Sequence, residues 1–208
     1  MKKSTMYDCV VTVIICAFTV ARAQDVPPPP RPNNNGPNAD FTMKYIQDRL
    51  NSVEIGWTEI AHADSTDIHY MNKYAITSAE ASRTRCTLAF KENLQNYSLD
   101  TPTTYTHVNS FDETFSFRDV ASVQVQPRSD FERRAGFSRE YSPPLYALTI
   151  KMVPGKTLHL RSRGESQSEG ERTEATLFFL DEDLTNRLAK AIIHAVELCE
   201  GGDKDPFK

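Results

Sequence analysis

Cysteines are the residues with the clearest chemical potential in this chain of 208 residues. Cys9 and Cys16 lie in a leading apolar segment, which leaves Cys86 and Cys199 for the folded protein. Cys86 falls in the apolar alternation of an expected strand, and Cys199 falls on the apolar stripe of the expected last helix. Both should point inward, and a disulfide needs Cα atoms within about 7 Å of each other. We expect a Cys86–Cys199 bridge, with two separate buried thiols or an intermolecular bond as alternatives.

No metal or catalytic motif accompanies them. The five histidines, which show no metal-ligand spacing, are His62, His69, His107, His159 and His194. His194 and Glu197 lie one helical turn apart, but di-iron sites with this spacing need a second copy. Asp181 and Asp183 are explained by capping of the helix that follows them. The chain also lacks a glycine-flanked serine, an HExxH pattern and a phosphate-binding loop. We therefore predict no catalytic, cofactor-binding or metal-binding residue.

The first 23 residues have the three parts of an export signal. They are a basic start at Lys2 and Lys3, an apolar run from Cys9 to Val20, and small residues at Ala21 and Ala23. A membrane span needs about 20 apolar residues, and this run is shorter. The pattern predicts cleavage after Ala23 and a periplasmic or extracellular protein. Retention as an anchor is one alternative. A lipid anchor on Cys16 is another, although Ile15 is large for lipoprotein processing.

Composition divides the rest of the chain. Residues 24–39 are rich in proline and asparagine and predict a flexible linker, because they offer no apolar pattern to bury. Residues 40–200 suffice for one domain with its own core, and 201–208 form a short tail. The net charge is −4, and removal of the basic signal makes the remainder more acidic. A nucleic-acid partner is therefore disfavoured, since phosphate binding takes a basic surface.

Periodicity predicts an α+β domain. A leading helix has Asp40 as its N-cap, and the final helix has Asp181 as its N-cap and stops at Gly201. Between them, strands are expected at 55–61, 68–76, 86–90, 113–126 with a break near Asp119, 145–153, 156–162 and 174–180. Turn residues favour antiparallel hairpins, most clearly "VPGK" at 153–156, and the polar stretches 128–144 and 162–174 predict loops. We expect an antiparallel curled sheet or partly open barrel of about seven strands, covered by the C-terminal amphipathic helix, with an extra N-terminal helix.

This layout resembles the pleckstrin-homology-like barrel. The stretches that carry the resemblance are "FSFRDVASVQVQP", "PLYALTI" and "LFFLDEDLTNRLAKAIIHAVELC", which are similar to uncharacterised secreted bacterial proteins with the same last helix. Phospholipid-binding members hold phosphates with a lysine on one strand and an Arg-x-Arg on the next. Lys73, Arg83 and Arg85 are similar to that pattern, so the resemblance implies an anion site there.

The sequence favours an exported, non-enzymatic binding domain for an unknown protein or a small anionic ligand. A hydrolase with a site in the long loops is a second hypothesis, and a cleft that gathers His107 or His159 with carboxylates would support it. A structural envelope role for the proline-rich arm is a third. The oligomeric state is left open.

Overall fold

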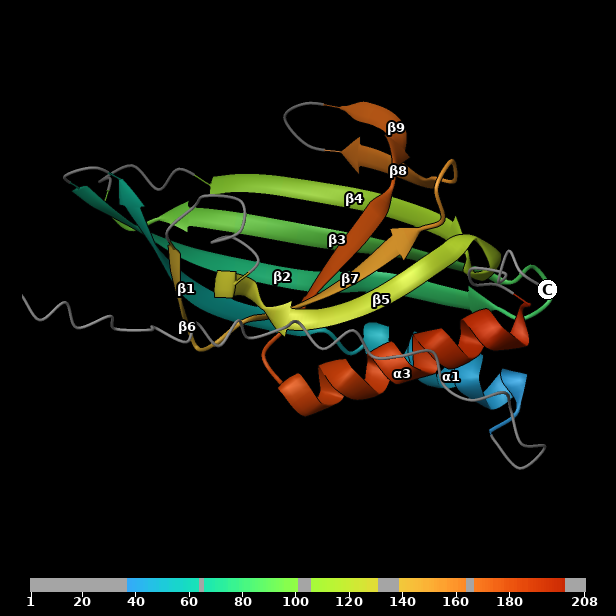
Figure 1. Ribbon diagram of the computed structural model, residues 1–208. Coiled ribbons are helices and arrows are strands. Elements are labelled where there is room, and N and C mark those ends of the chain that lie inside the picture. The colour runs from blue at the N-terminus through green and yellow to red at the C-terminus, as the bar shows by residue number, and fades with distance from the viewer. Residues whose placement is uncertain (1–36, 64–65, 101–105, 131–138, 164–166, 201–208) are drawn as a thin grey trace, which may run out of the picture.

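The computed structural model describes residues 37–63, 66–100, 106–130, 139–163 and 167–200. Over these residues the chain forms two antiparallel sheets with helices α1 and α3 beside them (Figure 1). In chain order the elements are α1 (Ala39–Leu50), β1 (Glu54–Ala63), β2 (Thr66–Ser82), β3 (Thr87–Ser98), β4 (Thr106–Ser116), the 3-10 helix η1 (Phe117–Asp119), β5 (Val120–Pro127), β6 (Arg139–Ser142), β7 (Tyr146–Met152), β8 (Leu158–Arg163), β9 (Ser168–Arg172), β10 (Glu174–Phe179) and α3 (Glu182–Leu198). The expected signal, most of the linker and the tail lie outside the described residues.

The larger sheet has seven strands in the order β6-β1-β2-β3-β4-β8-β9. Strands β1 to β4 follow one another as hairpins, so their registers fix which side chains share a face. Tyr74 on β2 lies opposite Leu94 on β3, and Glu92 on β3 lies opposite Phe111 on β4. These residues belong to the inner face, where Leu88 and Phe90 continue the alternation of β3 into the core.

The smaller sheet has three strands in the order β10-β7-β5. Strand β7 is the middle strand, and four of its successive residues, from Ala147 to Ile150, are buried. Leu148 lies opposite Leu177 on β10 and Val125 on β5, which makes one face of this sheet apolar. A continuous buried run of this kind marks a strand that is covered on both faces.

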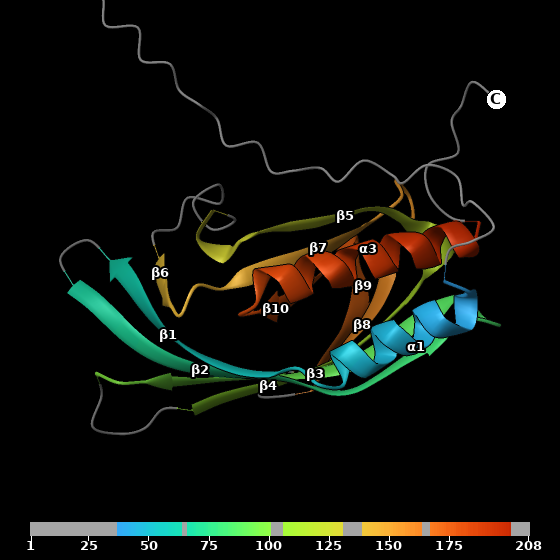
Figure 2. The ribbon, with the colours of Figure 1, turned by 90° about the horizontal axis from the view of Figure 1, so that it is seen from below.

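Helices α1 and α3 lie side by side along one side of the two sheets (Figure 2). The prediction that Asp40 caps the first helix was wrong: the Asn38 side chain caps α1 by accepting the Phe41 N–H, and Asp40 lies in the first turn. The Asp181 side chain caps α3 by accepting the Leu184 N–H. Helix α3 lies along β5 and β7, and α1 lies along β2. The fully buried Leu188 and Ile192 of α3 belong to the same core cluster as the apolar residues of both sheets.

The α+β class, the antiparallel pairing, the C-terminal helix and the N-terminal helix are confirmed. The prediction of about seven strands was wrong, because the described residues contain ten strands in two sheets. Two of the additional strands, β6 and β9, lie in stretches that were predicted to be loops because they are polar. Strand β6 lies in 128–144, and β9 lies in 162–174. Both are sheet edges, where one side of the strand faces solvent and little apolar pattern is needed.

The prediction of a hairpin at 153–156 was wrong in topology. The turn itself exists, since Lys156 N donates to Val153 O at 2.9 Å and Gly155 has a positive φ of 81°. However, β7 belongs to the smaller sheet and β8 pairs with β4 in the larger one. The turn therefore carries the chain from one sheet to the other, because turn residues specify a reversal and not the partner strand.

Candidate functional site

A cavity of about 270 Å³ lies where β10 of the smaller sheet meets the inner face of the larger one. Its lining combines three aromatic rings, three carboxyl groups and one guanidinium group. The lining residues are Tyr74, Glu92, Leu94, Phe111, Glu113, Arg172, Glu174, Thr176 and Phe178. The volume is just below the roughly 300 to 1,000 Å³ that is usual for small-molecule sites. The cavity therefore suits a small ligand.

Strand alternation explains this lining. Glu174, Thr176 and Phe178 are alternate residues of β10, and Ala175 and Leu177 between them are buried in the core. The residues that β2, β3 and β4 contribute also belong to one face of their sheet. Because side chains alternate with a period of two, both strand sets turn a mixed polar and aromatic face to the cavity.

Tyr74 and Glu92 form the first polar pair of the cavity. The Tyr74 hydroxyl donates a hydrogen bond to Glu92 Oε2 at 2.5 Å, and both side chains are buried. Burial raises the pKa of Glu92 to about 7, against the lowering effects of the Tyr74 hydrogen bond and of Arg172. Burial and the Glu92 carboxylate raise the pKa of Tyr74 well above its usual value, so the phenol stays the donor.

Glu113 is the least satisfied of the cavity carboxyls. Its side chain is 4% exposed, and its Oε2 atom has no hydrogen-bond partner among the described residues. Burial, followed by repulsion from Glu92, raises the pKa of Glu113 to about 8, while Arg172 opposes the shift. A buried carboxylate without a donor costs several kcal/mol unless it is protonated or meets a cation. The Glu113 carboxyl is therefore available to accept a hydrogen bond from a ligand or to pair with a positive charge.

Arg172 and Glu174 lie at the solvent side of the cavity. Both residues are exposed, whereas Tyr74, Glu92 and Glu113 are buried, so the cavity runs from solvent inward to the carboxyls. Arg172 lowers the pKa of both buried carboxyls through its charge. It forms no ion pair with either of them in the described part of the chain. Its charge offsets only part of the acidity of the lining.

Phe178 organises the aromatic wall. Its ring centroid lies 5.4 Å from that of Tyr74 in an edge-to-face arrangement and 6.2 Å from that of Trp57. The guanidinium carbon of Arg128 lies 4.9 Å from the same centroid. The Phe178 ring therefore already makes a cation–π contact, because the face of an aromatic ring is partially negative and attracts cations. The wall is therefore suited to apolar or positively charged groups.

Glu59 is a buried carboxyl outside the cavity lining, on β1. Asn72 Nδ2 donates to its Oε2 at 3.2 Å, and Arg139 Nη1 donates to its Oε1 at 2.7 Å. Each oxygen has a donor, and one donor is charged. Glu59 thus ties the edge strand β6 to the sheet and offers no unsatisfied atom to a ligand.

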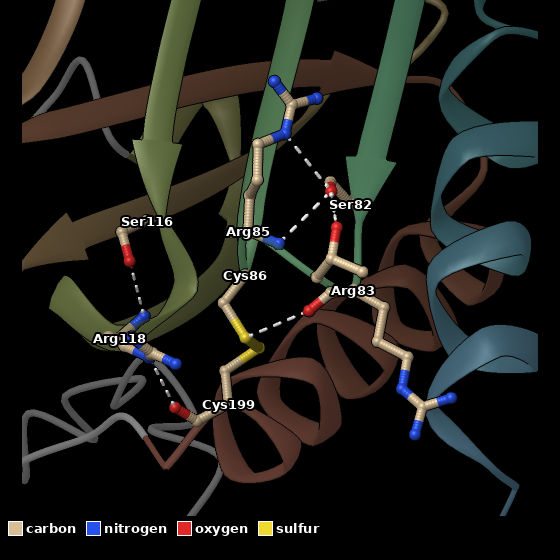
Figure 3. The surroundings of a disulfide bond; sticks show 8 residues. Ser82, Arg83, Arg85, Cys86, Ser116, Arg118 and Cys199 are labelled. Atoms are coloured by element: carbon tan, nitrogen blue, oxygen red, sulfur yellow. Dashed lines mark hydrogen bonds between the residues drawn. A yellow bond between two sulfur atoms is a disulfide. The ribbon is translucent and has the colours of Figure 1, made fainter.

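The predicted disulfide between Cys86 and Cys199 is confirmed, with Cα atoms 5.8 Å apart (Figure 3). The expectation that Cys86 lies within a strand was wrong, because it has a φ of 52° and ends the turn before β3. Its carbonyl accepts the Phe117 N–H at 2.8 Å, and Arg118 Nε donates to the Cys199 carbonyl at 3.2 Å. The bridge therefore joins the β2–β3 turn, η1 and the end of α3.

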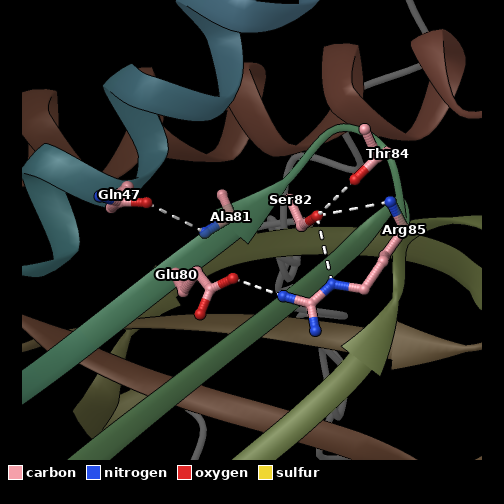
Figure 4. Close-up of polar contacts among 6 residues, drawn as sticks. All are labelled: Gln47, Glu80, Ala81, Ser82, Thr84 and Arg85. Carbon is pink, nitrogen blue, oxygen red and sulfur yellow. Dashed lines mark hydrogen bonds and ion pairs between the residues drawn. The ribbon is translucent and has the colours of Figure 1, made fainter.

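The structure does not bring Lys73, Arg83 and Arg85 together. Arg83 and Arg85 lie in the β2–β3 turn, where Arg83 pairs with Asp40 at 2.9 Å. Arg85 pairs with Glu80 (Figure 4). Lys73 lies mid-strand on β2, nine residues before the strand ends at Ser82, a separation of roughly 30 Å along an extended strand. An anion site made by all three stays a prediction that lacks geometric support.

Lys73 instead lines a larger hollow of about 410 Å³ on the outer face of the sheet. Glu54, Gly56, Asn93 and Gln95 line it as well. The Lys73 ammonium lies 5.8 Å from the Tyr97 ring centroid. The hollow has no buried polar side-chain atom without a partner among the described residues, unlike the cavity between the sheets. The cavity is therefore the better candidate site.

The histidines do not form a catalytic cleft in the described residues. His159 lies exposed on β8 and pairs with Glu169 at 3.0 Å, while the side chain of His107 lies outside the described residues. His62 pairs with Asp67 at 2.8 Å, and this hydrogen bond raises its pKa. His194 meets Glu197 at 3.4 Å and the Pro37 carbonyl at 3.0 Å. The last contact ties α3 to the start of the described chain. Over the residues described, no group of three or more His, Cys, Asp or Glu side chains is arranged to hold a metal ion.

Sequence reasoning missed Glu92 and Glu113, although a signal existed. Glu92 is in phase with Leu88 and Phe90 on its strand, and Glu113 is in phase with Phe111 and Phe115. A carboxyl at the inward phase of an apolar alternation is a buried charge, and buried charges are rare without a reason. Two of them on consecutive strands predict a common site.

Comparison with known proteins supplies no relative: no family model, curated protein or solved structure matches the chain. The resemblance to the pleckstrin-homology-like barrel therefore stays a prediction. In the described part of the chain, no helix, α1 and α3 included, combines the length and the apolar character that spanning a membrane requires.

Proposed function

We propose that this protein is an exported binding domain that holds a small molecule in the cavity between its sheets. The observation that carries the proposal is the pairing of an aromatic wall with a buried carboxyl, Glu113, whose Oε2 lacks a hydrogen-bond partner among the described residues. A folded chain gains nothing from such an oxygen, but a ligand that donates to it recovers the cost of its burial.

The intramolecular disulfide supports the exported part of the proposal, since such bonds persist in oxidising compartments. Cleavage of the signal after Ala23 is tested by the mass of the exported chain, which should begin at Gln24. Recovery of the intact N-terminus from membranes would contradict it. A role for the proline-rich arm concerns residues outside the described ranges.

A fragment screen tests the cavity. We would record binding of a mixture of small fluorinated anionic, neutral and cationic fragments by ¹⁹F NMR. Thr176→Trp, which fills the cavity from β10, should abolish binding, and Leu94→Trp should do the same from the other sheet. Thr114→Trp is the matched control, because Thr114 is exposed on the opposite face of β4 from Glu113. If no fragment binds, or if all three variants bind alike, the proposal is wrong.

Acid–base catalysis is a second candidate that the pKa values favour. Two neighbouring carboxyls, with pKa values raised to about 7 for Glu92 and about 8 for Glu113, can exchange protons near neutral pH. The fate of a bound compound separates the two functions. A binding domain returns its ligand unchanged, whereas an enzyme converts it, and mass spectrometry of the ligand after incubation distinguishes these results. The hydrolase site expected in the long loops involves stretches, 131–138 and 164–166, that lie outside the described residues.

A further inference from the structure

We propose that the ligand of this cavity is a small organic cation, a protonated amine with an apolar or aromatic body, whose ammonium group pairs with Glu113. This inference rests on the proposed function, because it specifies the ligand class of the same cavity. It replaces the small anionic ligand that the sequence suggested for Lys73, Arg83 and Arg85.

The charge of the lining gives the first argument. Glu92, Glu113 and Glu174 carry three carboxyl groups, and Arg172 is the one basic residue among the described lining residues. Glu92 and Glu113 are the two buried members of this set. As its carboxyls ionise, the lining becomes net negative, and it then repels an anion strongly because the dielectric constant inside the protein is low. A cation is the complementary charge.

The hydrogen-bond inventory gives the second argument. Glu92 already accepts from the Tyr74 hydroxyl, whereas Glu113 Oε2 accepts from no described residue. A protonated amine carries up to three donors and a full charge, so it can satisfy Glu113 and reach Glu92 as well. A neutral alcohol supplies a donor but no positive charge to favour the ionised forms of the two carboxyls.

The wall gives the third argument. Tyr74, Phe111 and Phe178 present aromatic rings to the same volume, and Leu94 adds an aliphatic surface. Ring faces attract cations, and more strongly when water is excluded. The same surfaces bury an apolar body. A bare metal ion would make no use of these rings, whereas an aryl or alkyl amine uses both the rings and the carboxyls.

Binding should be linked to protons. The titratable and charged groups that face the cavity are Tyr74 from β2, Glu92 from β3, Glu113 from β4, Arg172 from β9 and Glu174 from β10. Burial raises the pKa of Glu113 to about 8 and that of Glu92 to about 7, so at pH 7 Glu113 is mostly protonated and Glu92 is partly protonated. A bound cation favours their charged forms and expels those protons. Affinity for an amine should therefore rise with pH, by up to about tenfold per pH unit for each proton released.

Three matched probes test the charge preference by calorimetry: phenethylamine, 2-phenylethanol and phenylacetate, which share a body and differ in charge. At pH 7.5 phenethylamine should bind at least tenfold more tightly than the other two. Titrations in phosphate and in Tris should differ in heat, because the proton released on binding is taken up by buffers of different ionisation enthalpy. Affinity should also be higher at pH 8.5 than at pH 6.5.

Two variants locate the contact. Glu113→Gln should weaken phenethylamine binding at least tenfold and remove most of its pH dependence. Asp112→Asn is the matched control, since it removes the same charge one residue away on the outer side of the strand, and it should leave binding unchanged. Glu92→Gln serves as a second variant if Glu113→Gln does not fold.

The outcomes separate this inference from the proposed function. Equal or tighter binding of 2-phenylethanol or phenylacetate would overturn the cation inference and leave the cavity as a binding site. The cation inference is likewise overturned if Glu113→Gln and Glu92→Gln both bind phenethylamine as wild type does. Absence of binding for every probe and every screened fragment would overturn both.

Discussion

Glu59 and Glu113 are both buried carboxyls on the larger sheet, yet their surroundings differ. Glu59 is 8% exposed and receives hydrogen bonds from Asn72 and from the Arg139 guanidinium. Glu113 is 4% exposed, has an oxygen without a partner among the described residues, and lies near a second acid, Glu92. The first arrangement offsets the cost of burial within the protein. The second leaves that cost for a proton or a ligand to offset.

This difference separates a structural charge from a functional one. Arg139 comes from β6, so the Glu59 pair fastens an edge strand. The Glu113 carboxyl fastens nothing in the described residues and instead lines a cavity with aromatic walls. Perturbed carboxyls in a cleft are typical of binding and catalytic sites, whereas satisfied ones are typical of the fold. Substitutions in the two regions should therefore respond differently to pH.

Removal of the disulfide should give the largest change in the free energy of unfolding. The bridge joins residues 113 apart in sequence. The chain-entropy estimate for a loop near this size is about 4 to 5 kcal/mol. Cys86→Ser and Cys199→Ser should each lower the unfolding free energy of the exported protein by up to that amount, and the double variant should be scarcely worse. Urea denaturation measures all three. Additive losses in the double variant would contradict the bridge. Because neither cysteine lines the cavity, these variants should keep the pH dependence of stability that is expected from the cavity carboxyls.

Stability should fall as pH rises, through Glu113 and Glu92. Their folded pKa values, about 8 and about 7, lie above the ordinary value of 4.5, so the folded state holds protons that the unfolded chain has already lost. The associated stabilisation is complete below pH 4.5 and is lost as pH rises through 7 and 8. We expect a loss on the order of a few kcal/mol between about pH 5 and pH 9.

Glu113→Gln should remove most of this slope and be more stable than wild type at pH 9, because an amide cannot lose the proton. Denaturant melts at pH 5, 7 and 9 compare the two proteins. If the stability of the wild-type protein is flat or rises over this pH range, the burial of the Glu113 carboxylate is compensated by a partner within the protein.

Glu59→Gln should have the opposite sign. Arg139 loses its charged partner, and its side chain is partly exposed, so water limits the loss to about 1 to 3 kcal/mol. The loss should be similar at pH 7 and pH 9. Thermal melts of Glu59→Gln beside Glu113→Gln measure the contrast directly. If both substitutions stabilise the protein, Glu59 and Glu113 do not differ in the way proposed.

Tyr74→Phe should have the smallest effect. It removes the hydroxyl that donates to Glu92 and keeps the ring that packs on Phe178. Loss of one neutral hydrogen bond costs about 0.5 to 1.5 kcal/mol, and this range applies at pH 5, where Glu92 is protonated and the effect is smallest. Since the hydrogen bond holds the pKa of Glu92 down, the variant should lose more stability at pH 9 than at pH 5. An equal loss at both pH values would mean that the bond does not favour the charged carboxyl.

The sequence predicted the parts of this molecule that local pattern determines. Asp181 caps α3 as expected, the strand break near Asp119 is η1, and the two cysteines meet. The division into two sheets was not predictable by this route, because alternation in β8 identifies an inward face without naming the neighbouring strand. Polar edge strands β6 and β9 also carry too little apolar pattern to be recognised.

The cavity was missed for a related reason. Motif reasoning looks for residues close in sequence, whereas Tyr74, Glu92 and Glu113 come from three strands and meet only through their registers. Lys73, Arg83 and Arg85 are close in sequence, but strand extension separates the lysine from the turn. Inward phase on neighbouring strands was therefore more informative here than spacing along the chain.

The most direct test of the account is the titration of Glu113 itself. Carbon-13 NMR of glutamate side-chain carboxyls follows each group through pH, and the Glu113→Gln spectrum identifies the Glu113 resonance. We predict a midpoint near 8 in the free protein and a lower midpoint once phenethylamine is bound. A midpoint near the ordinary value of 4.5, unchanged by the amine, would show that Glu113 is already satisfied and that the cavity is not a cation site.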